Sequence, residues 1–233
     1  MDIRKELKIT KGDVVHAAVK STVSLIPGVG GYLSEAFSLL ITEPAEKRKE
    51  NILVMIDGRL RELEERSFDI ESLATNELFL SSVLQATQIA MRTHQKDKIM
   101  ALLNAITSVA TEQSLDDSQV HMFLSFIESF NEWHLKILLF FDNPKENLIS
   151  KGLSHDFYMG GASEALYRYF PELENRKEFT KQIMNELYQR GLLSSDAGVL
   201  NTMMTGSGIV ASRTSSTGKE FLSFISKPIT YND

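Results

Sequence analysis

The 233-residue sequence contains no cysteine, only five prolines and a single tryptophan. The absence of cysteine excludes disulfides, thiolate zinc sites and cysteine nucleophiles, and it fits a reducing compartment, so we expect a cytoplasmic protein. Few prolines and few low-complexity tracts argue against long disorder. No apolar stretch of signal-peptide length precedes Val23, so the first residues are not expected to act as a secretory signal.

The motifs of common enzyme classes are also missing. The histidines form no HxxxH or HExxH pair, and there is no GxSxG for a serine nucleophile. The glycines at Gly28–Gly31 lack the Lys-Ser/Thr that completes a phosphate loop. His94 and His134 are expected to be surface or packed helix residues. The sequence therefore predicts no catalytic residue, no metal site and no cofactor, and the protein is not expected to be an enzyme.

The most apolar stretch is Val23–Ile41, in which eighteen of nineteen residues are uncharged and only Glu35 breaks the run. A helix that is apolar on most of its surface is typical of a buried core helix. The alternative is a segment that contacts a membrane. Interspersed serines and the Pro27–Gly31 cluster disfavour a spanning helix, so we favour the core helix.

Hydrophobic periodicity predicts a mainly α fold, with a multi-helix bundle over residues 1–170. A charged helix is expected to begin at Thr42-Glu43-Pro44 and to bury the stripe Ile52, Ile56, Leu60 and Leu63. The predicted caps of later helices are Thr75 or Asn76, Asp116 or Asp117, and Asn131. The helix over 131–141 is apolar on nearly every side and is expected to be central. A further helix is expected over 155–170.

A polar row at helical spacing, Gln85, Gln88 and Arg92, lies in the predicted helix over 76–94. It could form a buried hydrogen-bond network or a site. Polar residues of this kind more often form an exposed or interhelical seam, which is the interpretation that we favour.

The last quarter of the chain changes character. Residues 177–190 read as a helix, 198–213 as a hairpin around Gly206-Ser207-Gly208, and 215–226 as a closing helix. This end, with Leu187-x-x-Arg-Gly-Leu-Leu193 and the Thr-Gly start at Thr217, resembles a winged-helix module. The resemblance implies a winged-helix-like domain over 171–233 with a short β-hairpin.

If this resemblance holds, several polar residues would form a contact surface for a nucleic acid or a partner. They are Arg176, Lys177, Thr180, Lys181 and Gln182 on the exposed side of the recognition-like helix, and Arg213 beside the wing. The net charge is −6, yet Arg176–Lys227 carries seven basic and four acidic residues. That local excess is weaker than the basic stripe of a dedicated nucleic-acid binder, and Glu178 and Glu186 weaken a phosphate-facing role.

The front of the chain, Ser21–Glu65, resembles uncharacterised bacterial proteins of the abortive-infection type in its apolar SLIPGVGG segment followed by a charged helix. Our leading hypothesis is a non-enzymatic bacterial interaction protein in phage defence, whose partner is another protein or a second copy of the chain. The first alternative is a DNA-binding regulator that works through the winged-helix-like end. The second is a conditional membrane-active effector that works through residues 23–41.

Overall fold

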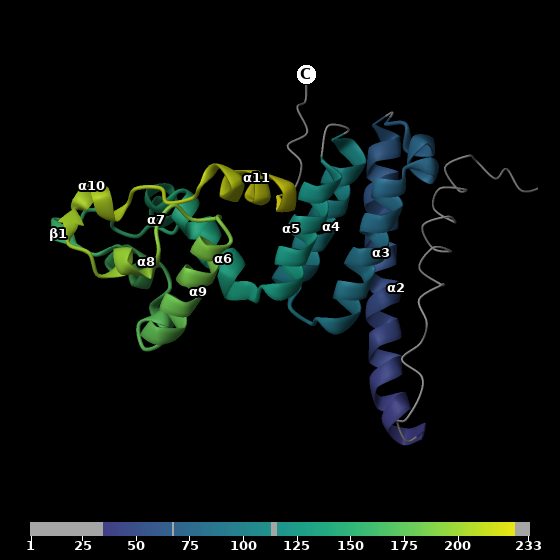
Figure 1. Ribbon diagram of the computed structural model, residues 1–233, viewed down its shortest axis with the longest axis horizontal. Coiled ribbons are helices and arrows are strands. Elements are labelled where there is room, and N and C mark those ends of the chain that lie inside the picture. Colours follow the sequence, from purple (N-terminus) through teal and green to yellow (C-terminus); the bar gives the residue numbers. More distant parts are fainter. Residues whose placement is uncertain (1–34, 67, 113–115, 227–233) are drawn as a thin grey trace, which may run out of the picture. The chain divides into compact units, whose positions relative to one another are not determined.

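The computed structural model describes residues 35–66, 68–112 and 116–226, with side chains from residue 44 onward. The described chain is mainly helical and contains one two-stranded antiparallel sheet (Figure 1), which confirms the predicted fold class at this level. It divides into two compact units. We call the described residues up to 129, with 225 and 226, unit 1, and residues 130–224 unit 2. The expected domain boundary near residue 170 falls inside unit 2.

Unit 1 is built from helices that pack on α3. They are α2 (Glu35–Glu65), η2 (Ile70–Thr75), α3 (Glu77–Arg92), α4 (Lys96–Thr111) and α5 (Asp117–Ser129). The predicted stripe of α2 is confirmed for Ile52, Ile56 and Leu60, which are all buried. Asn76 caps α3, because its Oδ1 accepts from the Phe79 N–H at 2.9 Å.

The predicted start of α2 at Pro44 is wrong, because the helix runs continuously from Glu35 through that residue. A proline removes one N–H from the helical hydrogen-bond ladder, but here the helix continues on both sides of Pro44. Residues 35–41, the last part of the apolar stretch, therefore belong to α2. The rest of the apolar stretch, residues 23–34, and the side chains of 35–41 lie outside what the structure describes.

Unit 2 is a set of short helices around α6. Its elements are α6 (Glu132–Asp142), α7 (Pro144–Ser150), β1 (Met159–Gly160), α8 (Ala162–Tyr169), η3 (Pro171–Leu173), α9 (Lys177–Gln189), η4 (Ala197–Leu200), β2 (Met204–Thr205), α10 (Gly206–Ile209) and most of α11 (Ser216–Ile225). Ile137, Leu138, Phe140 and Phe141 of α6 are buried, as its predicted central place requires, although Leu139 is exposed.

The predicted hairpin around Gly206-Ser207-Gly208 is wrong. These residues form the helical turn α10, and β2 pairs instead with β1, with Met159 opposite Thr205 and Gly160 opposite Met204. The predicted helix over 155–170 is correspondingly shorter, since it begins only at Ala162.

The glycines of this region serve close approach of the backbone. A Cβ on Gly206 would lie 1.9 Å from the Phe157 carbonyl oxygen, and one on Gly161 would lie 2.1 Å from the Leu200 carbonyl oxygen. The Gly206 N–H also donates to the Tyr158 carbonyl at 3.0 Å. The glycine-rich stretch therefore lets the segment around residue 206 pack against the segment around residue 158, and it does not form the local turn that we predicted.

Candidate partner interface

In unit 2, α8 and α9 follow one another along the chain with η3 between them. The inward side of α9 carries Thr180, Ile183, Met184 and Leu187, which are all buried. Its hydrophobic spacing of three to four residues explains why this segment folds as an amphipathic helix. The outward side of α9 is the surface on which the sequence had placed the contact residues.

Most of the expected contact residues do lie on that outward side, but their polar groups are already engaged. The Arg176 guanidinium stacks 4.0 Å from the centre of the Phe179 ring. Lys181 Nζ pairs with Glu178 at 2.8 Å, and Gln182 Nε2 donates to Glu186 at 2.9 Å. Lys177 is exposed as well. The charges on this side of α9 are therefore largely balanced within the helix itself.

The expected exposure is wrong for Thr180, which is fully buried. Its hydroxyl donates to the Arg176 carbonyl at 3.1 Å. A threonine that bonds to the carbonyl four residues earlier can bury its methyl group without leaving the hydroxyl unsatisfied.

Arg213 is also buried, with only 5% of its surface exposed, so its expected place on the surface beside the wing is wrong. Its guanidinium donates to the carbonyls of Gly208 and Ala211, both at 2.6 Å, and lies 5.6 Å from the centre of the Phe141 ring. Burial lowers the pKa of Arg213. Open carbonyls at the end of α10 need a donor, and this side chain supplies it.

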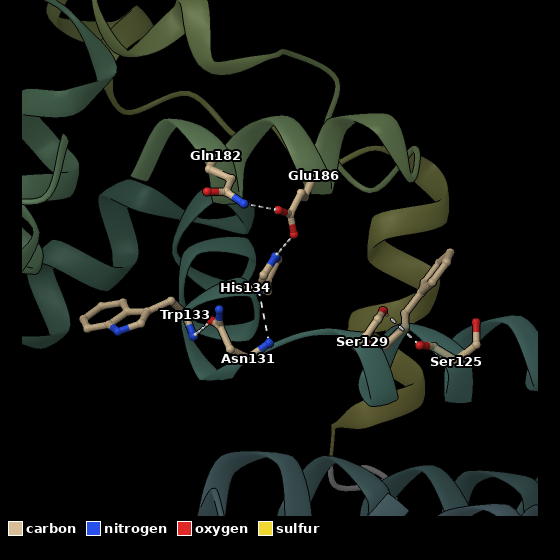
Figure 2. Close-up of polar contacts among 8 residues, drawn as sticks. Ser125, Ser129, Asn131, Trp133, His134, Gln182 and Glu186 are labelled. Atoms are coloured by element: carbon tan, nitrogen blue, oxygen red, sulfur yellow. Dashed lines mark hydrogen bonds and ion pairs between the residues drawn. The ribbon is translucent and has the colours of Figure 1, made fainter. Parts of the chain in front are cut away.

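A polar chain joins α6 to α9 (Figure 2). His134 is 3% exposed, and its Nε2 lies 2.8 Å from Glu186 Oε2. Its Nδ1 accepts from the Asn131 N–H at 3.2 Å, so the ring proton must reside on Nε2, which donates to Glu186. Phe130 stacks on the imidazole, with the ring centroids 4.5 Å apart.

Both ring nitrogens of His134 are engaged within unit 2, so this side chain ties the start of α6 to α9. This outcome agrees with the expectation of a packed helix residue. The signal in the sequence is the spacing Asn131-x-x-His134, which places a histidine at the capping-box position normally held by Glu or Gln.

Acid should weaken unit 2 through this chain. Burial lowers the pKa of His134, against the opposing effect of Glu186, and hydrogen bonds from Gln182 and His134 lower the pKa of Glu186. As the pH falls, the unfolded chain therefore binds protons at His134 and Glu186 at a higher pH than the folded protein does. The stabilisation from His134 is complete above its ordinary pKa of about 6.5 and is lost below it. Glu186 adds a further loss below its own ordinary value.

The measurement is the urea midpoint of unfolding followed by the fluorescence of Trp133, which is the sole tryptophan and lies in α6. We expect the midpoint to fall between pH 7 and pH 5. His134→Gln, which keeps an acceptor for the cap and does not titrate, should flatten this dependence, whereas His155→Gln should leave it unchanged. A midpoint that is equally pH-dependent in the His134→Gln protein would contradict the assignment.

Three exposed apolar side chains lie in or beside the β1–β2 ladder. Tyr158 is 90% exposed, Met203 68% and Met159 53%. We call these three residues the β tip. The backbone beneath them is braced, because Gly206 donates to the Tyr158 carbonyl and Gly160 pairs with Met204. The sequence did not reveal this group, since its members come from segments more than forty residues apart.

The polar row of unit 1 joins α3 to α5. Gln85 Oε1 lies 3.1 Å from His121 Nδ1, and Arg92 Nη2 pairs with Glu128 Oε1. Gln88 is exposed and takes part only through its carbonyl, which accepts from Arg92 Nε at 3.3 Å. These contacts form an interhelical seam, the arrangement that we favoured.

Within the described residues, no group of three or more His, Asp or Glu side chains is arranged to hold a metal ion. Over the same ranges, none of the helices combines the length and the apolar character that crossing a membrane requires. Neither the family models, nor the curated proteins, nor the solved structures with which the chain was compared give a match. The function must therefore be argued from the chain's own surfaces.

Proposed function

We propose that the protein is a non-enzymatic interaction protein, and that unit 2 is a winged-helix-like module that binds another protein through the β tip. The element order β1–α8–α9, the β1–β2 ladder, the bridge between Leu193 and Thr214 and the closing helix α11 support the winged-helix likeness. The observation that carries the proposal is the exposure of Tyr158, Met159 and Met203 on a braced backbone.

The chemistry of the β tip favours a protein partner. Tyrosine and methionine are enriched where protein interfaces are buried, and methionine adapts its shape to an apolar partner surface. Arg168 stacks on the ring of Phe157, which precedes Tyr158, at 4.0 Å and donates to the Ser154 carbonyl at 2.8 Å. An apolar tip with its cation engaged in this way suits the apolar centre of a protein interface better than a phosphate backbone.

The alternative, a DNA-binding regulator, has less support. Duplex DNA is held mainly by basic side chains on its phosphates. At α9, Lys181 is paired with Glu178 and Arg176 is stacked on Phe179. Arg213, which lies between α10 and α11, is buried. Fluorescence anisotropy with a labelled duplex at low salt tests this alternative. Binding that falls steeply with salt and is lost in a Lys177→Gln/Lys181→Gln protein would favour DNA over our proposal.

The protein-binding proposal is tested by photo-crosslinking of the full chain in the bacteria that express it. A benzoylphenylalanine replaces Tyr158 in one variant and Tyr188, an exposed tyrosine of α9, in the matched control. We expect a discrete crosslinked product from position 158 and none from position 188. A Met203→Ser substitution should reduce the product several-fold, because truncation of an energetically important interface residue costs more than about 1 kcal/mol.

Mass spectrometry of the product then distinguishes another protein from a second copy of this chain. Equal products from both positions, or none from position 158, would overturn the proposal. The hypothesis of phage defence rests on residues 21–65 and that of membrane contact on residues 23–41. Residues 21–34 lie outside the described ranges, and both hypotheses stay predictions.

A further inference from the structure

A pocket of about 360 Å³ lies in unit 1 between α2 and the connection from α3 to α4. Its apolar lining comes from Ile52 and Met55 of α2 and Ile99 of α4. Its polar lining includes Arg48 of α2 and His94 of the connection. The volume is at the lower end of the range for small-molecule sites, and the mixture of an apolar lining with a few polar groups is typical of them.

Arg48 is held in place at this pocket by its own side chain. Its Nε donates to the Met91 carbonyl at 2.8 Å, near the end of α3. That bond fixes the plane of the guanidinium and uses one of its five N–H donors. In the ranges that the structure describes, the Nη groups of Arg48 are not engaged by a carboxylate. A planar fork of donors is therefore presented at the pocket, which suits a carboxylate or a phosphate.

The charged side chains near the pocket rim are partly neutralised. Arg92, at the end of α3, pairs with Glu128, and Lys98 is buried with its Nζ donating to the Glu128 carbonyl at 2.9 Å. Lys96 is exposed beside Asp97. Arg48 is therefore the charged group of the pocket lining that meets an anion directly.

From these observations we propose that the pocket binds a small organic anion, in which a carboxylate or phosphate meets Arg48 and an apolar group of about one ring lies against Ile52, Met55 and Ile99. The apolar part adds burial and the anionic part fixes orientation. This site is in unit 1 and is independent of the β tip, so the two proposals can fail separately.

The test is isothermal titration calorimetry of the full chain with four probes: phenyl phosphate, benzoate, inorganic phosphate and benzamide. We expect phenyl phosphate or benzoate to bind at least tenfold more tightly than both inorganic phosphate, which lacks the ring, and benzamide, which lacks the charge. The tighter of the two aromatic anions identifies the preferred head group. No binding by either aromatic anion at millimolar concentration would overturn the proposal.

Two variants locate the binding. Arg48→Gln should weaken the aromatic anion at least tenfold, whereas Lys47→Gln, which removes the same charge from an exposed neighbour on α2, should change its affinity less than twofold. Asn51→Trp, at an exposed position of the pocket rim, should block binding by filling the space without removing a charge. Circular dichroism checks that each variant is folded. Binding that survives both Arg48→Gln and Asn51→Trp would show that the anion binds elsewhere.

Discussion

Arg213→Met should destabilise unit 2 by about 3–5 kcal/mol, because it leaves buried carbonyls without a donor. The guanidinium donates to Gly208 and Ala211 at 2.6 Å and to Ile209 at 3.4 Å, and a thioether can replace none of these bonds. The main-chain bond from the Arg213 N–H to the Phe141 carbonyl, at 2.8 Å, would remain. Urea denaturation followed by Trp133 fluorescence measures the loss.

A matched variant separates this effect from the loss of any arginine. Arg176→Met removes an exposed guanidinium that stacks on Phe179 in the same unit, and it should cost less than about 1 kcal/mol. Arg213→Lys keeps the charge but cannot reach several carbonyls at once, so it should recover only part of the stability. Replacing buried charges by apolar residues is sometimes neutral. An Arg213→Met protein as stable as the parent would mean that the carbonyls find other donors.

The parts of the fold that the sequence predicted are those that depend on neighbours along the chain. A helix stripe such as Ile52, Ile56 and Leu60 repeats every four residues, and a cap such as Asn76 acts within its own first turn. Both are determined by spacing and local hydrogen bonding, which a single sequence displays directly. The mainly α class follows from the same local signals.

The failures concern contacts between segments that are far apart in the sequence. The stretch around Gly206 has the composition of a hairpin turn, but β2 pairs with β1, more than forty residues earlier. The winged-helix resemblance placed Arg213 on the surface beside the wing, and its carbonyl partners at the end of α10 appear only when that turn is known to be helical. Composition cannot distinguish a glycine that makes a turn from one that admits another backbone.

The candidate surfaces also divide into features set by neighbours along the chain and features set by contacts between distant segments. The outward position of Lys181 and Gln182 on α9 follows from helical periodicity, which places them away from Ile183 and Met184. Their pairing with Glu178 and Glu186 could be suspected from the spacings of three and four residues. The β tip and the Arg48 pocket could not be foreseen, because each combines residues from elements that only the fold brings together.

Gly206→Ala provides the sharpest test of the close approach between the β1 and β2 segments. An added Cβ would lie 1.9 Å from the Phe157 carbonyl oxygen and 2.9 Å from its carbon, so the backbone itself must move. The displacement would strain the hydrogen bond from the Gly206 N–H to the Tyr158 carbonyl. We expect a loss of about 2–3 kcal/mol in the stability of unit 2, the range for overpacking a close contact.

Gly58→Ala is the matched control for the same chemical change. Gly58 lies inside α2, where an added Cβ has no neighbour within 4 Å. Since alanine favours the helix over glycine by about 1 kcal/mol, this variant should raise the melting temperature of the protein. The opposite signs of the two changes distinguish a steric clash from a general effect of alanine. A Gly206→Ala protein as stable as the parent would mean that the Phe157 and Gly206 backbones do not approach as closely as the structure places them. The β1–β2 ladder alone would then brace the backbone of the β tip.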